Sequence, residues 1–141
     1  MPFAFEKLLV YQKAIDFANA VCTATREFPR GYYFLVDQLN RAALSIAANI
    51  AEGNGRFTKA DRRNIFGIAR GSVQECVPLL ELAARQGLLT AERHAQLKSN
   101  LEEIARMLSG LINGLEKPRD GTDGRDGRSV PAGVARRPIA K

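Results

Sequence analysis

RAALSIAANIAEGNGRFTKADRRNIFGIARGSVQE, residues 41–75, is the stretch that decides the fold of this chain. At about 100° per residue, each half of it carries an apolar stripe with a polar stripe along one border. The glycine-rich segment AEGNGR, residues 51–56, lies between the halves. The stretch therefore predicts two amphipathic helices joined by a short turn.

Polar residues border the apolar face of both predicted helices. We refer to them, with one glycine, as the polar seam: Arg41, Ser45, Asn49, Glu52, Gly53, Ser72 and Glu75. Gly53 is expected to end the first helix, because glycine adopts the left-handed conformation without a steric penalty. Thr58 or Asp61 can cap the next helix. We interpret Glu52 and Glu75 as buried carboxylates in a structural network rather than a catalytic pair.

Length and composition bound the class of protein. The 141 residues, 45% hydrophobic and 26% charged, are sufficient for one globular domain with a substantial core. The sequence predicts neither a membrane span nor a signal peptide, so we expect a cytoplasmic protein. Cys22 and Cys76 lack CxxC spacing and lie on apolar stripes, which favours buried reduced thiols over a disulfide.

The segment before the seam predicts a helix over about residues 7–28 that carries two apolar stripes. Together the stripes cover roughly half of the helix circumference, more than the stripe of about 100° that a surface helix buries. The helix either lies deep within its own bundle or turns one stripe toward another subunit. We favour the second, because no helix of a four-helix bundle is fully enclosed.

Three further helices complete the predicted bundle. They span about residues 33–52, 59–86 and 90–115, and the last has leucines spaced by four and three. Pro78 predicts a kink in the third helix rather than a break. We expect a four-helix bundle over residues 1–117. Residues 118–141, rich in Gly, Arg, Asp and Pro, are expected to be disordered.

One folded surface is predicted to be basic. The exposed stripe of the third helix and the turn before it carry cations that we refer to as the basic face: Arg56, Lys59, Arg62, Arg63 and Arg70. The tail adds 6 Lys+Arg against 3 Asp+Glu, half of the net charge of +6. A basic surface of this kind is suited to phosphate groups.

Motifs for catalysis, cofactors or metals are not recognisable. His94 is the only histidine and has no local nucleophile or carboxylate partner, and Ala91 occupies the position that a di-iron Glu-x-x-His motif needs for glutamate. AEGNGR lacks the lysine of a phosphate-binding loop and joins two helices. We therefore expect no catalytic residue, cofactor or metal ion, and no enzyme.

Residues 5–115 resemble the four-helix-bundle family of proteins encoded in intervening sequences of bacterial 23S ribosomal RNA genes, often labelled S23 ribosomal proteins. The segments that carry the resemblance are FEKLLVYQKA, QLNRAALSIAANIAEGNGR and FGIARGSVQE. It implies an all-α, antiparallel up-down-up-down bundle that forms a closed homo-oligomer, apparently a pentamer. It implies no activity, since that of most members is unknown.

Three function classes follow from these observations. A homo-oligomer that binds RNA or DNA through the basic face ranks first, because a ring would repeat the cations around one axis. A protein-binding scaffold without a nucleic-acid role is the alternative, in which the polar seam serves fold and assembly. An enzyme ranks far below both. Binding that weakens with salt would indicate phosphate contacts and so separate the first two classes.

Overall fold

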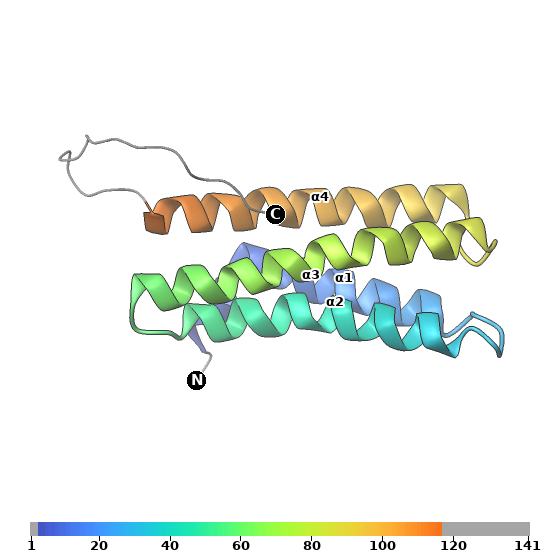
Figure 1. Cartoon of the computed structure of the whole chain (residues 1–141), viewed down its shortest axis with the longest axis horizontal. Helices are drawn as coiled ribbons and strands as arrows, with labels where there is room; N and C mark the ends of the chain where they lie inside the picture. Colours follow the sequence, from blue (N-terminus) through green and yellow to red (C-terminus); the bar gives the residue numbers. More distant parts are fainter. Residues whose placement is uncertain (1–2, 117–141) are drawn as a thin grey trace.

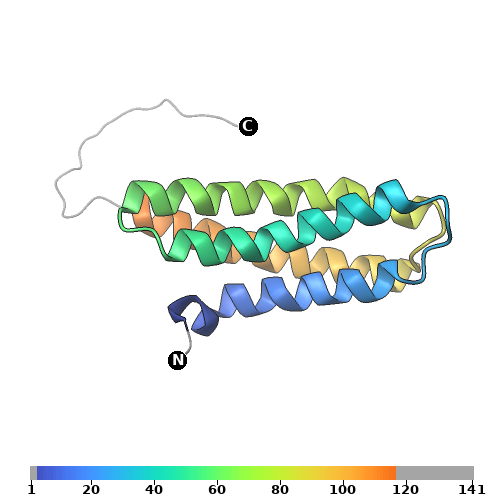
Figure 2. The ribbon, with the colours of Figure 1, turned by 90° about the horizontal axis from the view of Figure 1, so that it is seen from below.

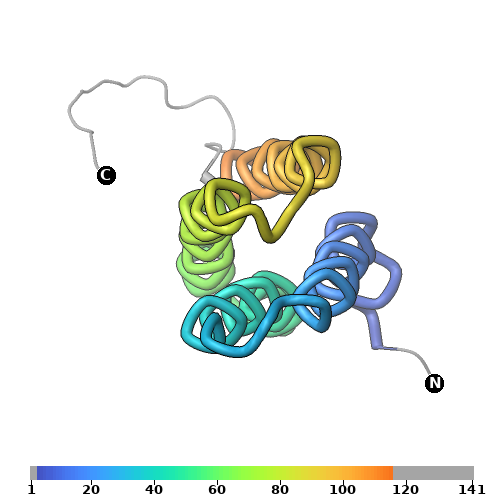
Figure 3. The backbone as a smooth tube through the Cα atoms, turned by 90° about the vertical axis from the view of Figure 1, so that its right-hand side faces the viewer, coloured from blue at the N-terminus to red at the C-terminus, as the bar shows by residue number. Residues whose placement is uncertain are grey.

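Four α-helices follow a short 3₁₀ turn in the computed structural model, which describes residues 3–116. The elements are η1 (Ala4–Lys7), α1 (Leu9–Thr25), α2 (Tyr33–Asn54), α3 (Lys59–Arg85) and α4 (Ala91–Glu116). Consecutive helices run antiparallel (Figures 1 and 2), and an end-on view places them at the corners of a square (Figure 3). The expected antiparallel four-helix bundle is confirmed. The tail expected to be disordered lies outside the described residues.

The helix ends differ from expectation at one glycine. Thr58 accepts a hydrogen bond from the Asp61 amide at 3.0 Å, so Thr58 is the cap of α3. The expectation that Gly53 ends α2 was wrong, because the helix continues to Asn54 and Gly55 follows it. Gly31 and Gly87 instead adopt positive φ, in the turns after α1 and α3. Glycine therefore follows the end of α2, as predicted, but it is Gly55 rather than Gly53.

The core lies along the axis shared by all four helices. It consists of one stripe from each helix, with Phe17, Ile46, Cys76 and Leu108 among its buried members. On α1, the stripe with Val10 and Phe17 is buried, whereas the stripe with Ile15 and Cys22 is partly exposed. The bundle therefore covers only one of the two apolar stripes predicted for this helix.

Two local expectations have mixed outcomes. The first helix begins at Leu9 rather than Lys7, because Leu8 has extended backbone angles and separates it from the 3₁₀ turn. Pro78 lies inside α3, which continues as one helix. Gln74, whose carbonyl would accept the missing amide, is exposed and open to water. The kink itself stays a prediction.

The two cysteines occupy different environments. Both thiols are free, as expected. Cys76 is buried, and this burial, with a smaller contribution from the Glu75 charge, raises the pKa of its thiol to about 12. The expectation of burial was wrong for Cys22, which is exposed and donates from Sγ to Asn40 Oδ1 at 3.1 Å. Its stripe lies beside α2 rather than on the bundle axis.

Membrane insertion finds no support in the described helices. Over residues 3–116, none of them combines the length and the apolar character that crossing a bilayer requires. Their apolar side chains instead meet one another in the core.

Core packing on α4 can be tested with a matched pair of leucines. Leu108→Ala should lower the free energy of unfolding by roughly 2–5 kcal/mol, because the fully buried side chain leaves a cavity. Leu9→Ala, at a leucine that is 56% exposed, should change it by roughly 0.5 kcal/mol or less. Urea denaturation followed by circular dichroism measures both. Equal losses would contradict the assigned core.

Candidate functional site

The centre of the polar seam is a hydrogen-bonded cluster between α2 and α3. The Ser45 and Ser72 hydroxyls lie 2.9 Å apart, and the Asn49 amide donates to Ser45 Oγ at 3.0 Å and to the Ser45 carbonyl at 2.8 Å. Ser72 donates to the Ile68 carbonyl at 3.3 Å. Because each hydroxyl has one proton, Ser45 is the donor to Ser72. These hydrogen bonds therefore join α2 and α3 through neutral groups alone.

The charged members of the seam lie outside this cluster. The Arg41 side chain is 78% exposed and forms an ion pair with Asp37 at 3.8 Å. Glu52 forms an ion pair with Arg56, four residues later in the chain. Glu75 is exposed on α3. The expectation that Glu52 and Glu75 are buried in one network with Arg41 was therefore wrong. All three lie at the edge of the helix–helix contact, where water solvates them and a large desolvation cost is avoided.

Gly53 has a packing role that the sequence reading missed. It is buried inside α2, and a Cβ added there would lie 2.8 Å from Phe66 Cε1 and 3.3 Å from Ile65 Cβ. Phe66 is itself almost fully buried, so its ring has little room to move away. Glycine at this position therefore permits α2 and α3 to approach closely. Its place directly before the last residue of α2 could equally have signalled a cap.

The basic face surrounds the α2–α3 turn and extends along α3. Lys59 and Arg70 are exposed, whereas Arg62 and Arg63 are half-buried. Arg62 Nε donates to the Arg56 carbonyl at 2.9 Å, which ties the start of α3 to the turn. Between residues 52 and 70 there are five basic and two acidic side chains, a local charge of +3. The structure therefore concentrates positive charge at one end of the bundle.

A shallow hollow of about 410 Å³ opens within the basic face. It is lined by Ala60, Arg63, Asn64, Gly67 and Ile68, all on the first half of α3. Gly67 has no heavy atom of another part of the chain within 4 Å of where its Cβ would be, so no side chain covers the hollow here. Amides inside the helix are already used in helix hydrogen bonds, so the charge of Arg63 is what the lining offers a phosphate group.

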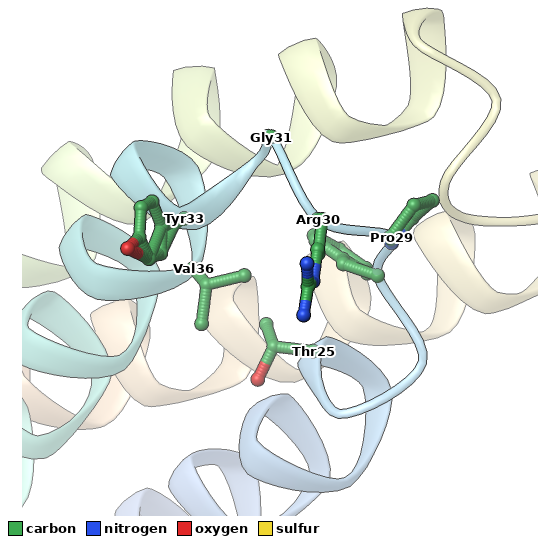
Figure 4. Close-up of a pocket in the computed structure, with 7 residues that line it drawn as sticks. Thr25, Pro29, Arg30, Gly31, Tyr33 and Val36 are labelled. Carbon is green, nitrogen blue, oxygen red and sulfur yellow. The ribbon is translucent and has the colours of Figure 1, made fainter.

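Another pocket lies at the opposite end of α2, in the α1–α2 turn (Figure 4). It has a volume of about 510 Å³, and sequence reasoning did not anticipate it. Thr25 donates its hydroxyl proton to the Cys22 carbonyl at 3.3 Å and accepts from the Asn40 amide at 3.0 Å. The buried hydroxyl of Thr25 is therefore satisfied by the protein itself. Nothing in the lining calls for a bound ligand.

The side chains that most often bind metal ions are dispersed over residues 3–116. Over residues 3–116, no three His, Cys, Asp or Glu side chains are grouped to hold a metal ion. His94, the only histidine, is half-buried in the first turns of α4.

The chain matches the model of one known protein family. The model of the 23S rRNA-intervening sequence protein family matches residues 6–110, most of the chain and nearly all of the bundle. The chain belongs to this family. The match includes the whole polar seam and the whole basic face. No curated protein matches the chain.

A solved structure supports the family assignment. The chain is similar to a protein of unknown function from the S23 ribosomal protein family of Bacteroides thetaiotaomicron, whose crystal structure was determined at 1.70 Å resolution. The TM-score is 0.68 at 26% sequence identity, and the match covers 74% of this chain and 98% of the other. The two proteins therefore share the bundle over almost the full length of the relative.

The close approach at Gly53 can be tested with a glycine pair. Gly53→Ala should lower the free energy of unfolding by roughly 1–3 kcal/mol, because the new methyl group overlaps the buried Phe66 ring. Gly67→Ala adds the same methyl group in open space on α3 and should stabilise by up to roughly 1 kcal/mol. Thermal denaturation compares the two variants. A Gly53→Ala protein as stable as Gly67→Ala would show that the helices are not held this closely.

Proposed function

We propose that this 23S rRNA-intervening sequence protein is a non-enzymatic homo-oligomer that binds RNA or DNA through its basic face. The observation that carries the proposal is the local charge of +3 over residues 52–70, which cover the α2–α3 turn and the first half of α3, with Lys59 and Arg70 exposed. Cations on a rigid helix attract phosphates without reading sequence. The ligand is therefore the backbone of a nucleic acid, and its base sequence is a minor factor.

Assembly multiplies this modest charge. An interface is favoured by apolar side chains exposed on three consecutive helices, Ile15 on α1, Leu44 on α2 and Ile68 on α3. An interface that covers these side chains would remove their apolar area from water. Ile68 and Arg70 are two residues apart on α3, about 200° around the helix, so an interface at Ile68 leaves Arg70 accessible but covers the hollow that Ile68 shares with Arg63.

The expected assembly is a closed ring of five copies, as the family resemblance implies. Each subunit would present one basic face, and the same turn would be repeated around the ring axis. Repeated weak phosphate contacts then act together through a high effective concentration. A strand long enough to contact several subunits should bind far more tightly than a short one.

Oligomer mass tests the assembly. Light scattering at micromolar concentration should give about five times the chain mass of 15.5 kDa. Leu44→Glu should reduce this mass, because a charge placed in an apolar interface loses its hydration. Leu9→Glu, at a leucine of similar exposure near the start of α1, should leave it unchanged. A wild-type mass near that of one chain would refute the assembly.

Charge reversal tests nucleic-acid binding. The Lys59→Glu, Arg70→Glu double variant should weaken binding and lower the slope of log K against log salt by roughly 2 per subunit engaged, since two phosphate contacts are lost. The matched control is Arg26→Glu, Arg30→Glu, which makes the same change in net charge at the other end of α2. Fluorescence anisotropy with labelled RNA and DNA measures both.

The outcome separates the two function classes. Equal weakening by both double variants would show that only net charge matters and would refute the basic face as the binding surface. Failure of the wild-type oligomer to bind either nucleic acid at low salt would refute the nucleic-acid role. The protein-binding scaffold would then be the better description, because the exposed apolar side chains of α1, α2 and α3 would remain as its binding surface.

A further inference from the structure

The α2–α3 turn presents an aromatic ring to solvent. Phe57 is 100% exposed, more than any other large hydrophobic residue in the described chain, and it lies at the end of the bundle where α2 meets α3 (Figure 2). Single exposed apolar residues are common on protein surfaces and do not by themselves indicate a function. The position of this ring within the basic face is what distinguishes it.

The backbone on both sides of Phe57 is held in place. The Gly55 and Arg56 amides donate to the Glu52 and Gly53 carbonyls at 3.1 and 3.2 Å. On the other side, Thr58 caps α3 through the Asp61 amide. The turn is therefore fixed by hydrogen bonds up to the residues that flank the ring. An aromatic side chain on a fixed turn loses little conformational entropy when it binds a ligand.

Positive charge surrounds the ring along the chain. Arg56 precedes it directly, and Lys59 and Arg62 follow within five residues. The Arg62 Nε bond to the Arg56 carbonyl holds these cations on the two sides of the turn near one another. Phe57 therefore lies between cations in the sequence, which would bring a bound phosphate chain to the same turn. The turn thus combines the two features that proteins use on unpaired nucleotides, cations for phosphates and an aromatic face for bases.

We propose that Phe57 is a stacking platform for an unpaired base, so that the basic face selects single-stranded nucleic acid over duplex. This inference rests on the proposed function and adds the class of ligand to it. Bases within a duplex are already stacked on their neighbours and offer no free face to a side chain on the protein surface. Phosphate contacts are shared by both ligands, so the preference depends on the ring.

Two alanine variants test the preference. Phe57→Ala should weaken binding of a pyrimidine single strand by roughly tenfold or more, because stacking on an aromatic side chain is lost. Its affinity for a duplex of the same length should stay within about twofold, since phosphate contacts are kept. Tyr33→Ala is the control, because Tyr33 is also exposed (73%) but lies at the other end of α2. Parallel assays with oligo-U and oligo-dT identify the sugar.

A fluorescence variant tests the contact directly. The chain contains no tryptophan, so Phe57→Trp and Tyr33→Trp each introduce a single emitter. Emission of the Phe57→Trp protein should fall when a single strand is added and should change little with duplex, and Phe57→Trp should keep the single-strand affinity that Phe57→Ala loses. Emission of the Tyr33→Trp protein should not change with either ligand.

The results distinguish this inference from the proposed function. If wild-type protein binds nucleic acid but Phe57→Ala weakens single strand and duplex equally, or neither, the stacking role is refuted and the phosphate contacts stand. If no nucleic acid binds, both proposals fail. The inference is also wrong if Phe57→Ala lowers the oligomer mass and the emission of Phe57→Trp shows a buried tryptophan without ligand. The ring would then belong to a contact between subunits.

Discussion

The close packing of α2 against α3 is the contact on which the rest of this structure depends. It is possible because Gly53 presents no side chain to the buried Phe66 ring and because two serine hydroxyls, Ser45 and Ser72, meet between the helices. Larger side chains at these positions would separate the helices and open the core. The same contact fixes the turn that follows α2, and with it the position of the cations and the aromatic ring. Packing at one helix pair thus positions the surface proposed for binding.

The division between neutral and charged groups in the polar seam has an energetic reason. Ser72 can be buried, and Ser45 and Asn49 half-buried, because the three side chains form hydrogen bonds within two helices. Arg41, Glu52 and Glu75 keep their hydration at the rim, where exposed ion pairs contribute little to stability. The neutral cluster therefore has a structural role, which is to join α2 and α3 by hydrogen bonds. The charged rim is left accessible for contacts outside the chain.

Different sides of the bundle are suited to different partners. Apolar side chains on α1, α2 and α3 suit another protein surface, whereas the α2–α3 turn and the outer side of α3 carry cations. On α3, Ile68 and Arg70 lie on opposite sides of the helix, so that a ring of subunits that buries Ile68 could leave Arg70 exposed. Assembly and binding would then reinforce one another, since each subunit adds the same positive turn. The pocket at the other end of α2, whose buried Thr25 hydroxyl is already satisfied, takes no part in this scheme.

The sequence by itself determined the number, order and approximate ends of the four helices, because apolar periodicity and turn residues act over only a few positions. It also predicted the exposure of Lys59 and Arg70, whereas Arg62 and Arg63, expected on the same exposed surface, are half-buried. The tertiary structure alone decided that Gly53 is a packing position, that Cys22 is exposed and that the carboxylates of Glu52 and Glu75 avoid the core. All of these residues lie at the border of an apolar stripe, so their burial depends on where the neighbouring helix packs. Helix periodicity specifies a face to within about one residue, and a border residue can be buried or solvated within that margin.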